Sequence, residues 1–317
     1  MLIKRALVFM ILLSVCASQE EPEQDIITTI ISEQDPEGQF DFTKFNYCNM
    51  NVPKCEGEKH SACDCKMRGQ RTVVLDNLTQ FRQDVLDKHN ELRNFFASGK
   101  EPQKYVFGKT ISNMVVLNYD LELEYIAKCY GGYFVTGHDK CRVTHDETSV
   151  GQNLAGVSAQ FDDNHLTSIE RWYNEVEYVD GLEYLYETWV HKNPPRGHIG
   201  HLTQLVWWSM RRVGCARIWN PANNFSWYKW AIICNYKAAP GLTPGNMKGS
   251  NIFEVGPPCT KCPFDWKCNV KYTSLCGKHY PAPRDSPTPT PHGKASERLV
   301  ASQIISLGAL VVLSYFC

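Results

Sequence analysis

The chain has 317 residues and a net charge of −1, with 43% hydrophobic and 12% aromatic residues. This length and hydrophobic content allow one large or two modest domains with a buried core. A nearly neutral charge argues against nucleic acid or an anionic membrane surface as the main partner.

The first 18 residues predict an export signal. Lys4 and Arg5 precede the apolar run ALVFMILLSV, and the small residues Ala17 and Ser18 follow it. A charged start, an apolar stretch and small residues are typical of a cleaved secretory signal. We therefore expect a secreted or extracellular protein. Residues 19–45 are acidic and lack a core pattern, so we interpret them as a leader.

Residues 46–248 carry the strong periodicity and predict the main domain. LTQFRQDVLDKHNELRNFFASG places its apolar side chains on one stripe, which predicts a helix with Thr79 as its N-cap and Gly99 past its end. DLELEYIAKC predicts a second helix, capped by Asp120. LTSIERWYNEVEYV has helical spacing too and predicts a third helix.

Three later segments predict strands. They are HLTQLVWWS (201–209), RVGCARIW (212–219) and YKWAIICNYK (228–237). The last two flank the turn-rich NPANNFS, so we expect them to form a hairpin. Cys215 and Cys234 then lie on opposite arms of the hairpin and can bond to each other.

The cysteines predict a disulfide framework. Of fourteen cysteines, Cys16 lies in the signal and Cys317 ends the chain, which leaves twelve. An even number in an exported chain favours disulfides. Cys259-x-x-Cys262 is also half of a zinc-ribbon pattern, but the later cysteines are spaced too widely for the other half. The twelve are Cys48, Cys55, Cys63, Cys65, Cys129, Cys141, Cys215, Cys234, Cys259, Cys262, Cys268 and Cys276.

The C-terminal part predicts three further segments. Residues 249–278 hold four cysteines and too little apolar material for a core, so disulfides must stabilise them. Residues 279–298 are proline-rich and predict an extended stalk. Residues 299–317 are apolar with no basic residue behind them, which indicates a GPI-anchor signal or, as the alternative, a short membrane span. Asn77 and Asn224 lie in glycosylation motifs.

Several motifs together resemble a known family. GHLTQLVWWSMRRVGCA and IICNYKAAPG resemble the two signatures of the CAP superfamily, and HNELR and WYNE match in order and spacing. YCNMNVPKCEGEKHSAC and HDKCR…VGQN are similar to arthropod antigen 5, the venom and salivary allergens. PCTKCPFDWKCNVKYTSLC resembles the hinge of cysteine-rich secretory proteins.

The resemblance implies an α+β fold, a three-layer α-β-α sandwich with a small disulfide-rich C-terminal extension. It also implies four disulfide pairs. These are Cys48–Cys63, Cys55–Cys141, Cys65–Cys129 and Cys215–Cys234.

The resemblance also implies a cleft where two histidines and two acids hold zinc or another divalent cation. By motif position the ligands are His138, Glu175 and His201, with His145 as a rival for the first histidine. Gln152 stands at the position of the second acid. An amide is a weak ligand and accepts no proton as a general base. Two interpretations stay open: a cation site, or a metal-free cluster of hydrogen-bonded polar groups.

We expect a non-enzymatic binding protein whose partner is a host protein or a small hydrophobic ligand such as a sterol, fatty acid or eicosanoid. The alternative is a hydrolase or protease with His201 as base and Glu175 orienting it. That alternative needs a nucleophilic serine or cysteine beside the base, and no Gly-x-Ser-x-Gly motif is present. Aromatic residues that are candidates to line a hydrophobic site are Trp207, Trp208, Trp219, Trp227 and Trp230.

Overall fold

The computed structural model describes residues 40–50, 52–65, 78–132, 137–157, 165–190, 192–219 and 230–284. The signal, most of the acidic leader, Asn77, Asn224 and the apolar tail lie outside these ranges. Within them, no helix is both long enough and apolar enough to span a membrane.

A mixed four-stranded sheet forms the centre. Its strands are β1 (Asn118–Tyr119), β2 (Val150–Val157), β3 (Met210–Trp219) and β4 (Trp230–Ala238), in the order β1-β3-β4-β2. β3 and β4 are antiparallel, with Cys215 opposite Cys234, which confirms the predicted hairpin. β2 pairs with β4 and forms one edge of the sheet. The strand β2 was not predicted, because VGQNLAGV lacks a clear alternation of apolar and polar residues.

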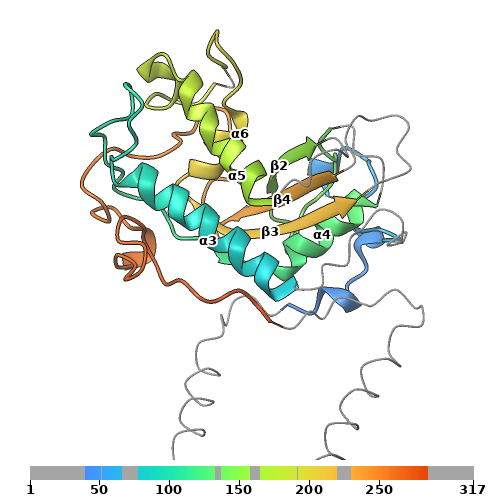
Figure 1. Cartoon of the computed structure of the whole chain (residues 1–317). Coiled ribbons are helices and arrows are strands. Elements are labelled where there is room, and N and C mark those ends of the chain that lie inside the picture. The colour runs from blue at the N-terminus through green and yellow to red at the C-terminus, as the bar shows by residue number, and fades with distance from the viewer. Residues whose placement is uncertain are drawn as a thin grey trace, which may run out of the picture.

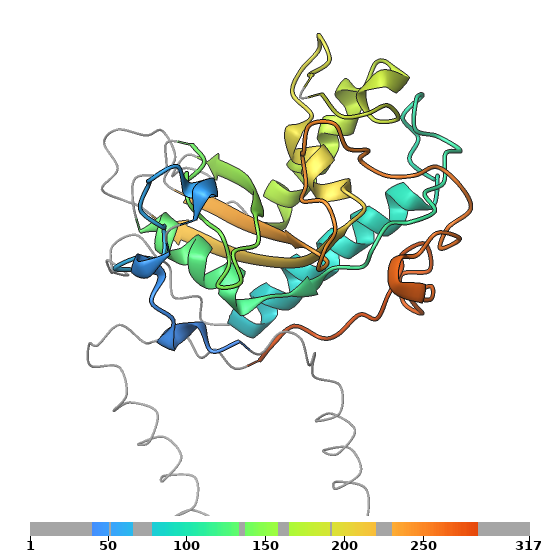
Figure 2. The same cartoon turned by 180° about the vertical axis from the view of Figure 1, so that it is seen from behind.

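Helices cover both faces of the sheet. α4 (Leu121–Gly131) packs on β3 and β4, while α3 (Leu78–Ala97), α5 (His165–Asn174) and α6 (Gly200–Val206) lie on the other side (Figures 1 and 2). Gly214 lets α4 approach closely, since a Cβ there would lie 2.3 Å from the Asp120 carbonyl oxygen. The expected three-layer α-β-α fold is therefore confirmed.

Short 3-10 helices complete the secondary structure. They span Phe42–Lys44, Tyr47–Asn49, Pro53–Cys55, Glu175–Tyr178, Leu182–Tyr184 and Pro263–Asp265. The first three belong to the N-terminal segment, and the last lies in the cysteine-rich extension.

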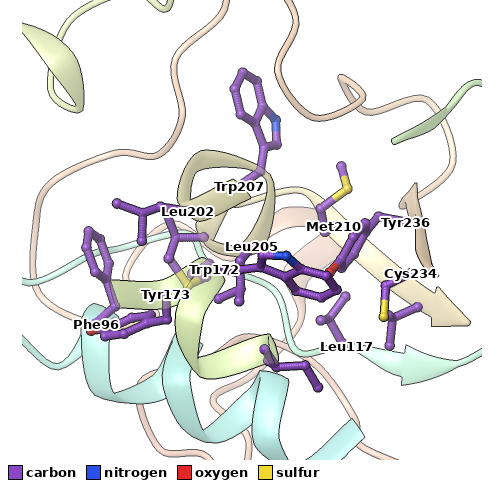
Figure 3. Close-up of a cluster of buried hydrophobic side chains, with 14 of the residues drawn as sticks. Phe96, Leu117, Trp172, Tyr173, Leu202, Leu205, Trp207, Met210, Cys234 and Tyr236 are labelled. Atoms are coloured by element: carbon purple, nitrogen blue, oxygen red, sulfur yellow. The ribbon is translucent and has the colours of Figure 1, made fainter. Parts of the chain in front are cut away.

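The main core lies between the sheet and the layer that holds α3, α5 and α6. Figure 3 shows Phe96 of α3 beside Tyr173 of α5, with Leu202 and Leu205 of α6 and Trp207 nearby. Phe96, Leu202, Leu205 and Trp207 are all fully buried. Burying each such side chain contributes about 1.5 to 3 kcal/mol, so this contact between layers is a main source of stability.

The three predicted helices are present, with two corrections at their ends. Asp120 caps α4 by accepting a hydrogen bond from the Leu123 N–H at 3.0 Å, as predicted. Gly99 follows α3 with a φ of +72°, also as predicted. Thr79, however, lies inside α3, so its predicted role as N-cap was wrong. α5 ends earlier than expected and continues as the 3-10 helix that starts at Glu175.

The strand predicted for residues 201–209 was wrong, because the chain forms α6 there. Leu202, Leu205 and Val206 are spaced three and four apart and are fully buried together on one side of this helix. The β-branched and aromatic residues of the run favoured a strand. Periodicity cannot separate a buried strand from a buried helix in so short a segment, and packing against α5 decides it.

All four predicted disulfides are confirmed. In the extension the structure adds Cys259–Cys268 and Cys262–Cys276, so Cys259 and Cys262 belong to different disulfides and form no zinc-ribbon half-site. The extension also joins the main domain, because Cys276 forms a β-bridge with Val115 beside β1. Disulfides replace the core that this region lacks.

The docked part of the chain continues past the predicted start of the stalk at 279. The backbone of residues 278–284 hydrogen-bonds to the side chains of Thr79, Arg82, Gln83 and Asn118 at distances of 2.7 to 3.1 Å. We call residues 278–284 the C-terminal strap. It lies along α3 and β1 and supplies a carbonyl partner to the buried Arg82.

We expect a chain cut after Gly277 to be less stable than one cut after Arg284. The first cut removes the strap and leaves Arg82 and Asn118 short of partners, whereas the second leaves every strap contact in place. At about 0.5 to 1.5 kcal/mol per hydrogen bond, the difference should be about 2 to 5 kcal/mol in the free energy of unfolding. Urea denaturation of both truncated proteins measures it, and equal midpoints would show that the strap contributes nothing.

Candidate functional site

His201 and Glu175 form one half of the predicted site. Glu175 Oε1 accepts a hydrogen bond from His201 Nδ1 at 2.6 Å. Glu175 Oε2 accepts the backbone N–H groups of His201 and Leu202, both at 2.9 Å, at the start of α6. Trp172 stacks against the imidazole with ring centroids 6.1 Å apart. Because a carboxylate only accepts, Nδ1 carries the proton in this hydrogen bond, and Nε2 is the nitrogen that faces away from Glu175.

His138 and Gln152 form the other half. His138 Nδ1 lies 2.9 Å from Gln152 Oε1. The Gln152 amide nitrogen donates to Asp139 Oδ1 at 2.9 Å and to Asn235 Oδ1 at 3.0 Å. Both of those partners are oxygens, so the network requires the amide nitrogen on their side and its oxygen on the histidine side. His138 therefore also carries its proton on Nδ1 and keeps the Nε2 lone pair.

The two halves lie on opposite sides of the edge strand β2. Successive side chains of a strand point to opposite faces. Gln152 shares the face of its β4 partner Asn235, while Asn153 donates to the His201 carbonyl oxygen at 3.1 Å on the other face. We call His138, Gln152, Glu175 and His201 the tetrad, which consists of two hydrogen-bonded pairs on either side of this edge strand.

Several neighbouring groups shift the pKa of His138. Partial burial of the ring among its neighbours is the largest effect, and it lowers the pKa of His138. Part of the side chain remains exposed to solvent. The hydrogen bond with Gln152 raises this pKa, while the positive charge of Arg142 and the His201 ring lower it further. The net direction is downward, so His138 is neutral at pH 7 and its Nε2 is available as a ligand atom.

The tetrad offers two ligand nitrogens and no compact set of three. Within the described ranges, three or more ligand atoms come within 4.8 Å of one another only in sets that contain disulfide-bonded cysteines. Both oxygens of Glu175 accept hydrogen bonds from α6, so Glu175 orients His201, and the ligand role expected for Glu175 stays a prediction. Zinc-binding histidines usually donate their other N–H to a carboxylate or carbonyl. Each of the two histidines therefore has the hydrogen-bond arrangement that is typical of a zinc-binding histidine.

His145 lies elsewhere and is not the first histidine of the tetrad. Its Nδ1 is 2.8 Å from Glu122 Oε2, and its backbone N–H donates to Oε1 of the same side chain. Its ring stacks on Phe40 with centroids 3.5 Å apart. Glu122 is buried and also accepts the Tyr47 hydroxyl at 2.7 Å. Burial is the main cause that raises the pKa of Glu122. His145 thus holds the N-terminal segment on α4.

Asp139 and Asn235 were missed as parts of the site. Asp139 directly follows His138 in HDKCR, and Asn235 lies inside the IICNYK motif, so both belong to motifs that the family resemblance rests on. Nothing in the spacing marks either as a partner of Gln152. The pairing of β2 with β4 and the return of the 137–140 loop bring them together.

The candidate aromatic residues mostly pack inward. Trp207 is fully buried in the main core, and Trp208 packs against it. Trp230 is half-buried with the Arg217 guanidinium 4.3 Å from its ring centroid. The Trp219 side chain and Trp227 lie outside the described residues.

These features define a disulfide-linked α-β-α protein with a pair of oriented histidines at the edge of its sheet. Residues 86–236 match CAP, the Cysteine-rich secretory protein family. The chain is 32% identical over 229 residues to Venom allergen 3 of Solenopsis invicta, covering 66% of this chain and 89% of that one. It is 32% identical over 224 residues to Venom allergen 5 of Vespula pensylvanica, covering 66% and 99%. The protein belongs to the CAP family and is related to the venom allergens.

Two further relatives show how much of each chain the similarity covers. The chain is 31% identical over 240 residues to the Cysteine-rich venom protein of Tityus serrulatus, but these cover only 54% of that longer relative and 71% of this chain. The crystal structure of NaASP2 with Zn2+ is 25% identical with a TM-score of 0.49, over 62% of this chain and 94% of that one. Relationship to venom proteins, together with six disulfides in the described residues, indicates secretion.

Proposed function

We propose that this CAP protein is a secreted, non-enzymatic binding protein and that His138 and His201 bind a divalent cation such as zinc. One observation carries the proposal. In each histidine Nδ1 forms the hydrogen bond, to Gln152 or to Glu175, and Nε2 has no hydrogen bond to the described part of the chain. A bound cation would supply a fixed positive charge at the edge of β2. Glu175 and Gln152 would hold the two rings in the orientation that ligation needs.

The contacts of the histidines favour binding over hydrolysis. A histidine base in a hydrolase activates a serine or cysteine within hydrogen-bonding distance. In the described ranges, neither His138 nor His201 has a hydrogen bond to a serine, threonine or cysteine side chain. The twelve cysteines of the framework are all disulfide-bonded, so they offer no thiol nucleophile.

For the partner, we propose a hydrophobic ligand or an apolar surface of a host protein. Four large apolar side chains are exposed in the segments beyond Glu175 and after β4: Tyr178, Leu182, Val190 and Met247. The backbone of Trp189 hydrogen-bonds to Gly249 and Ser250, which brings the chain next to Val190 close to the chain that follows Met247. Large apolar side chains exposed on neighbouring segments are typical of interaction sites.

Calorimetry with zinc tests the cation site on protein purified from the medium of cells that express the full chain. We expect saturable binding that His201→Ala weakens by about 10-fold or more, because a ligand is lost. His198→Ala is the matched control, since His198 is exposed, lies three residues away and contacts Asn193 instead. Zinc binding that is unchanged in His201→Ala, or absent in the wild type, would contradict the proposal.

Two assays on the same material test the remaining parts. Turnover of a generic peptide or ester substrate that His201→Ala abolishes would contradict a non-enzymatic role. Binding of a labelled sterol, fatty acid or eicosanoid would identify a lipid partner, while failure across all three classes would leave the host protein. Lipid anchoring through residues 299–317 is tested by release from cells with a phosphatidylinositol-specific phospholipase.

A further inference from the structure

Asp139 forms the base of a chain of hydrogen bonds that ends at the tetrad. The residue is buried, with 8% of its surface exposed. Its Oδ1 accepts the Gln152 amide at 2.9 Å and forms an ion pair with Arg142 at 3.2 Å. Its Oδ2 accepts the Ser61 hydroxyl at 2.5 Å. Three donors therefore fix this carboxylate in place, and a charge-assisted acceptor of this kind is a strong one.

The Gln152 amide passes this constraint on to His138. Its nitrogen donates to two oxygens, those of Asp139 and Asn235, and its oxygen faces His138 Nδ1. A flipped amide would put its oxygen against both acceptors and its nitrogen against the N–H of the ring. Asp139 and Asn235 therefore determine the orientation of the Gln152 amide. The amide oxygen in turn determines that Nδ1 of His138 carries the proton.

We propose that Asp139 is a positioning residue for the tetrad. Through the Gln152 amide it holds His138 with its proton on Nδ1 and its Nε2 lone pair free. On the other side of β2, Glu175 does the same for His201 in a single direct hydrogen bond. Asp139 therefore orients His138 through the Gln152 amide, whereas Glu175 orients His201 directly. This inference deepens the proposed cation site and rests on it only for its effect on affinity.

The arrangement dictates that position 152 be an amide. A glutamate there would bring a second carboxylate next to Asp139 Oδ1 and against the oxygen of Asn235, because both now accept from the amide nitrogen. Two carboxylates at hydrogen-bonding distance repel each other. A glutamate at position 152 should therefore destabilise the fold and disturb the orientation of His138, unless the charge at position 139 is removed as well.

A double-mutant cycle tests this dependence with Gln152→Glu, Asp139→Asn and the combined variant. Two-bond proton–nitrogen NMR at neutral pH reports which nitrogen of the His138 ring carries the proton, without any cation. Wild type should show it on Nδ1. Gln152→Glu alone should lower the urea midpoint and bind zinc about 10-fold or more weakly. The combined variant should recover most of both losses. Asp139→Asn alone should stay folded, because the amide oxygen can accept from Gln152 and Arg142 while the amide nitrogen donates to the Ser61 hydroxyl.

Each result decides the proposal. A wild-type His138 ring with its proton on Nε2 would overturn it, even if Gln152→Glu failed to fold. A Gln152→Glu variant that binds zinc more tightly than wild type, with no further gain on adding Asp139→Asn, would also overturn it. If no variant binds zinc, the proposed cation site fails, while the NMR result and the recovery of the urea midpoint still decide the role of Asp139.

Discussion

Replacing Arg93 by methionine is expected to lower the free energy of unfolding by about 3 to 5 kcal/mol, or to prevent secretion of the protein. Arg93 lies in α3 with its side chain fully buried. Its guanidinium donates at 2.5 to 3.4 Å to the carbonyl oxygens of Val115, Leu205, Trp207 and Trp208. Methionine fills similar volume but leaves these buried acceptors without a donor, and each unpaired acceptor is costly.

The cation itself is tolerated because carbonyl dipoles surround it. Burial lowers the pKa of Arg93 to about 9, yet the group stays charged at neutral pH. Arg93→Lys keeps the charge but offers fewer donors, so we expect a smaller loss than with methionine. Lys261→Met, in an exposed ion pair with Glu254, is the surface control and should change stability by less than about 0.5 kcal/mol. Equal urea midpoints for Arg93→Met and wild type would contradict this role.

Glu124→Gln is expected to have the second large effect, about 3 to 5 kcal/mol at pH 7. The Glu124 carboxylate is buried and accepts the Arg82 guanidinium in two hydrogen bonds, at 2.7 and 2.9 Å. It also accepts Lys128 and the Tyr119 hydroxyl. A neutral amide leaves the buried charge of Arg82 without a counter-ion and turns one acceptor into a donor. Removing one partner of a buried pair costs far more than the pair contributes.

The effect of Glu124→Gln should depend on pH. Burial alone raises the pKa of Glu124, but the hydrogen bond from Arg82 and the charge of Lys128 outweigh it, so the net pKa is lowered. A carboxylate with a lowered pKa stabilises the folded state fully above its unfolded value of 4.5 and loses that contribution as the pH falls through the folded pKa. The difference between wild type and variant should therefore be full at pH 7 and shrink below pH 4.5.

Urea unfolding of both proteins at pH 7, 5 and 3 measures this difference. Glu170→Gln is the matched control, because Glu170 pairs with Lys88 at the surface and should matter little at any of these values. A difference between wild type and Glu124→Gln that stays constant down to pH 3 would show that the charge of Glu124 is not what stabilises the pair.

The sequence by itself determined the helices 78–97 and 121–131 and the hairpin of β3 and β4. Each depends on spacing between neighbouring residues, which a single stretch of chain displays in full. Local capping by Asp120 was predictable for the same reason. The predicted hairpin already allowed the Cys215–Cys234 pair, whereas the other three pairs of the main domain were available only through the family resemblance. The two pairs of the extension came from the structure.

Only the tertiary structure decided the site. Residues 201–206 form a helix because α5 and the sheet bury them from several sides, and that environment is not visible in their own pattern. His138 and His145 are both histidines in one short segment, and contacts with distant residues assign one to the tetrad and the other to Glu122. Asp139 acquires its role through Gln152 and Asn235 on two paired strands. Local pattern encodes secondary structure, whereas the partner of a polar side chain depends on which remote segments the fold brings together.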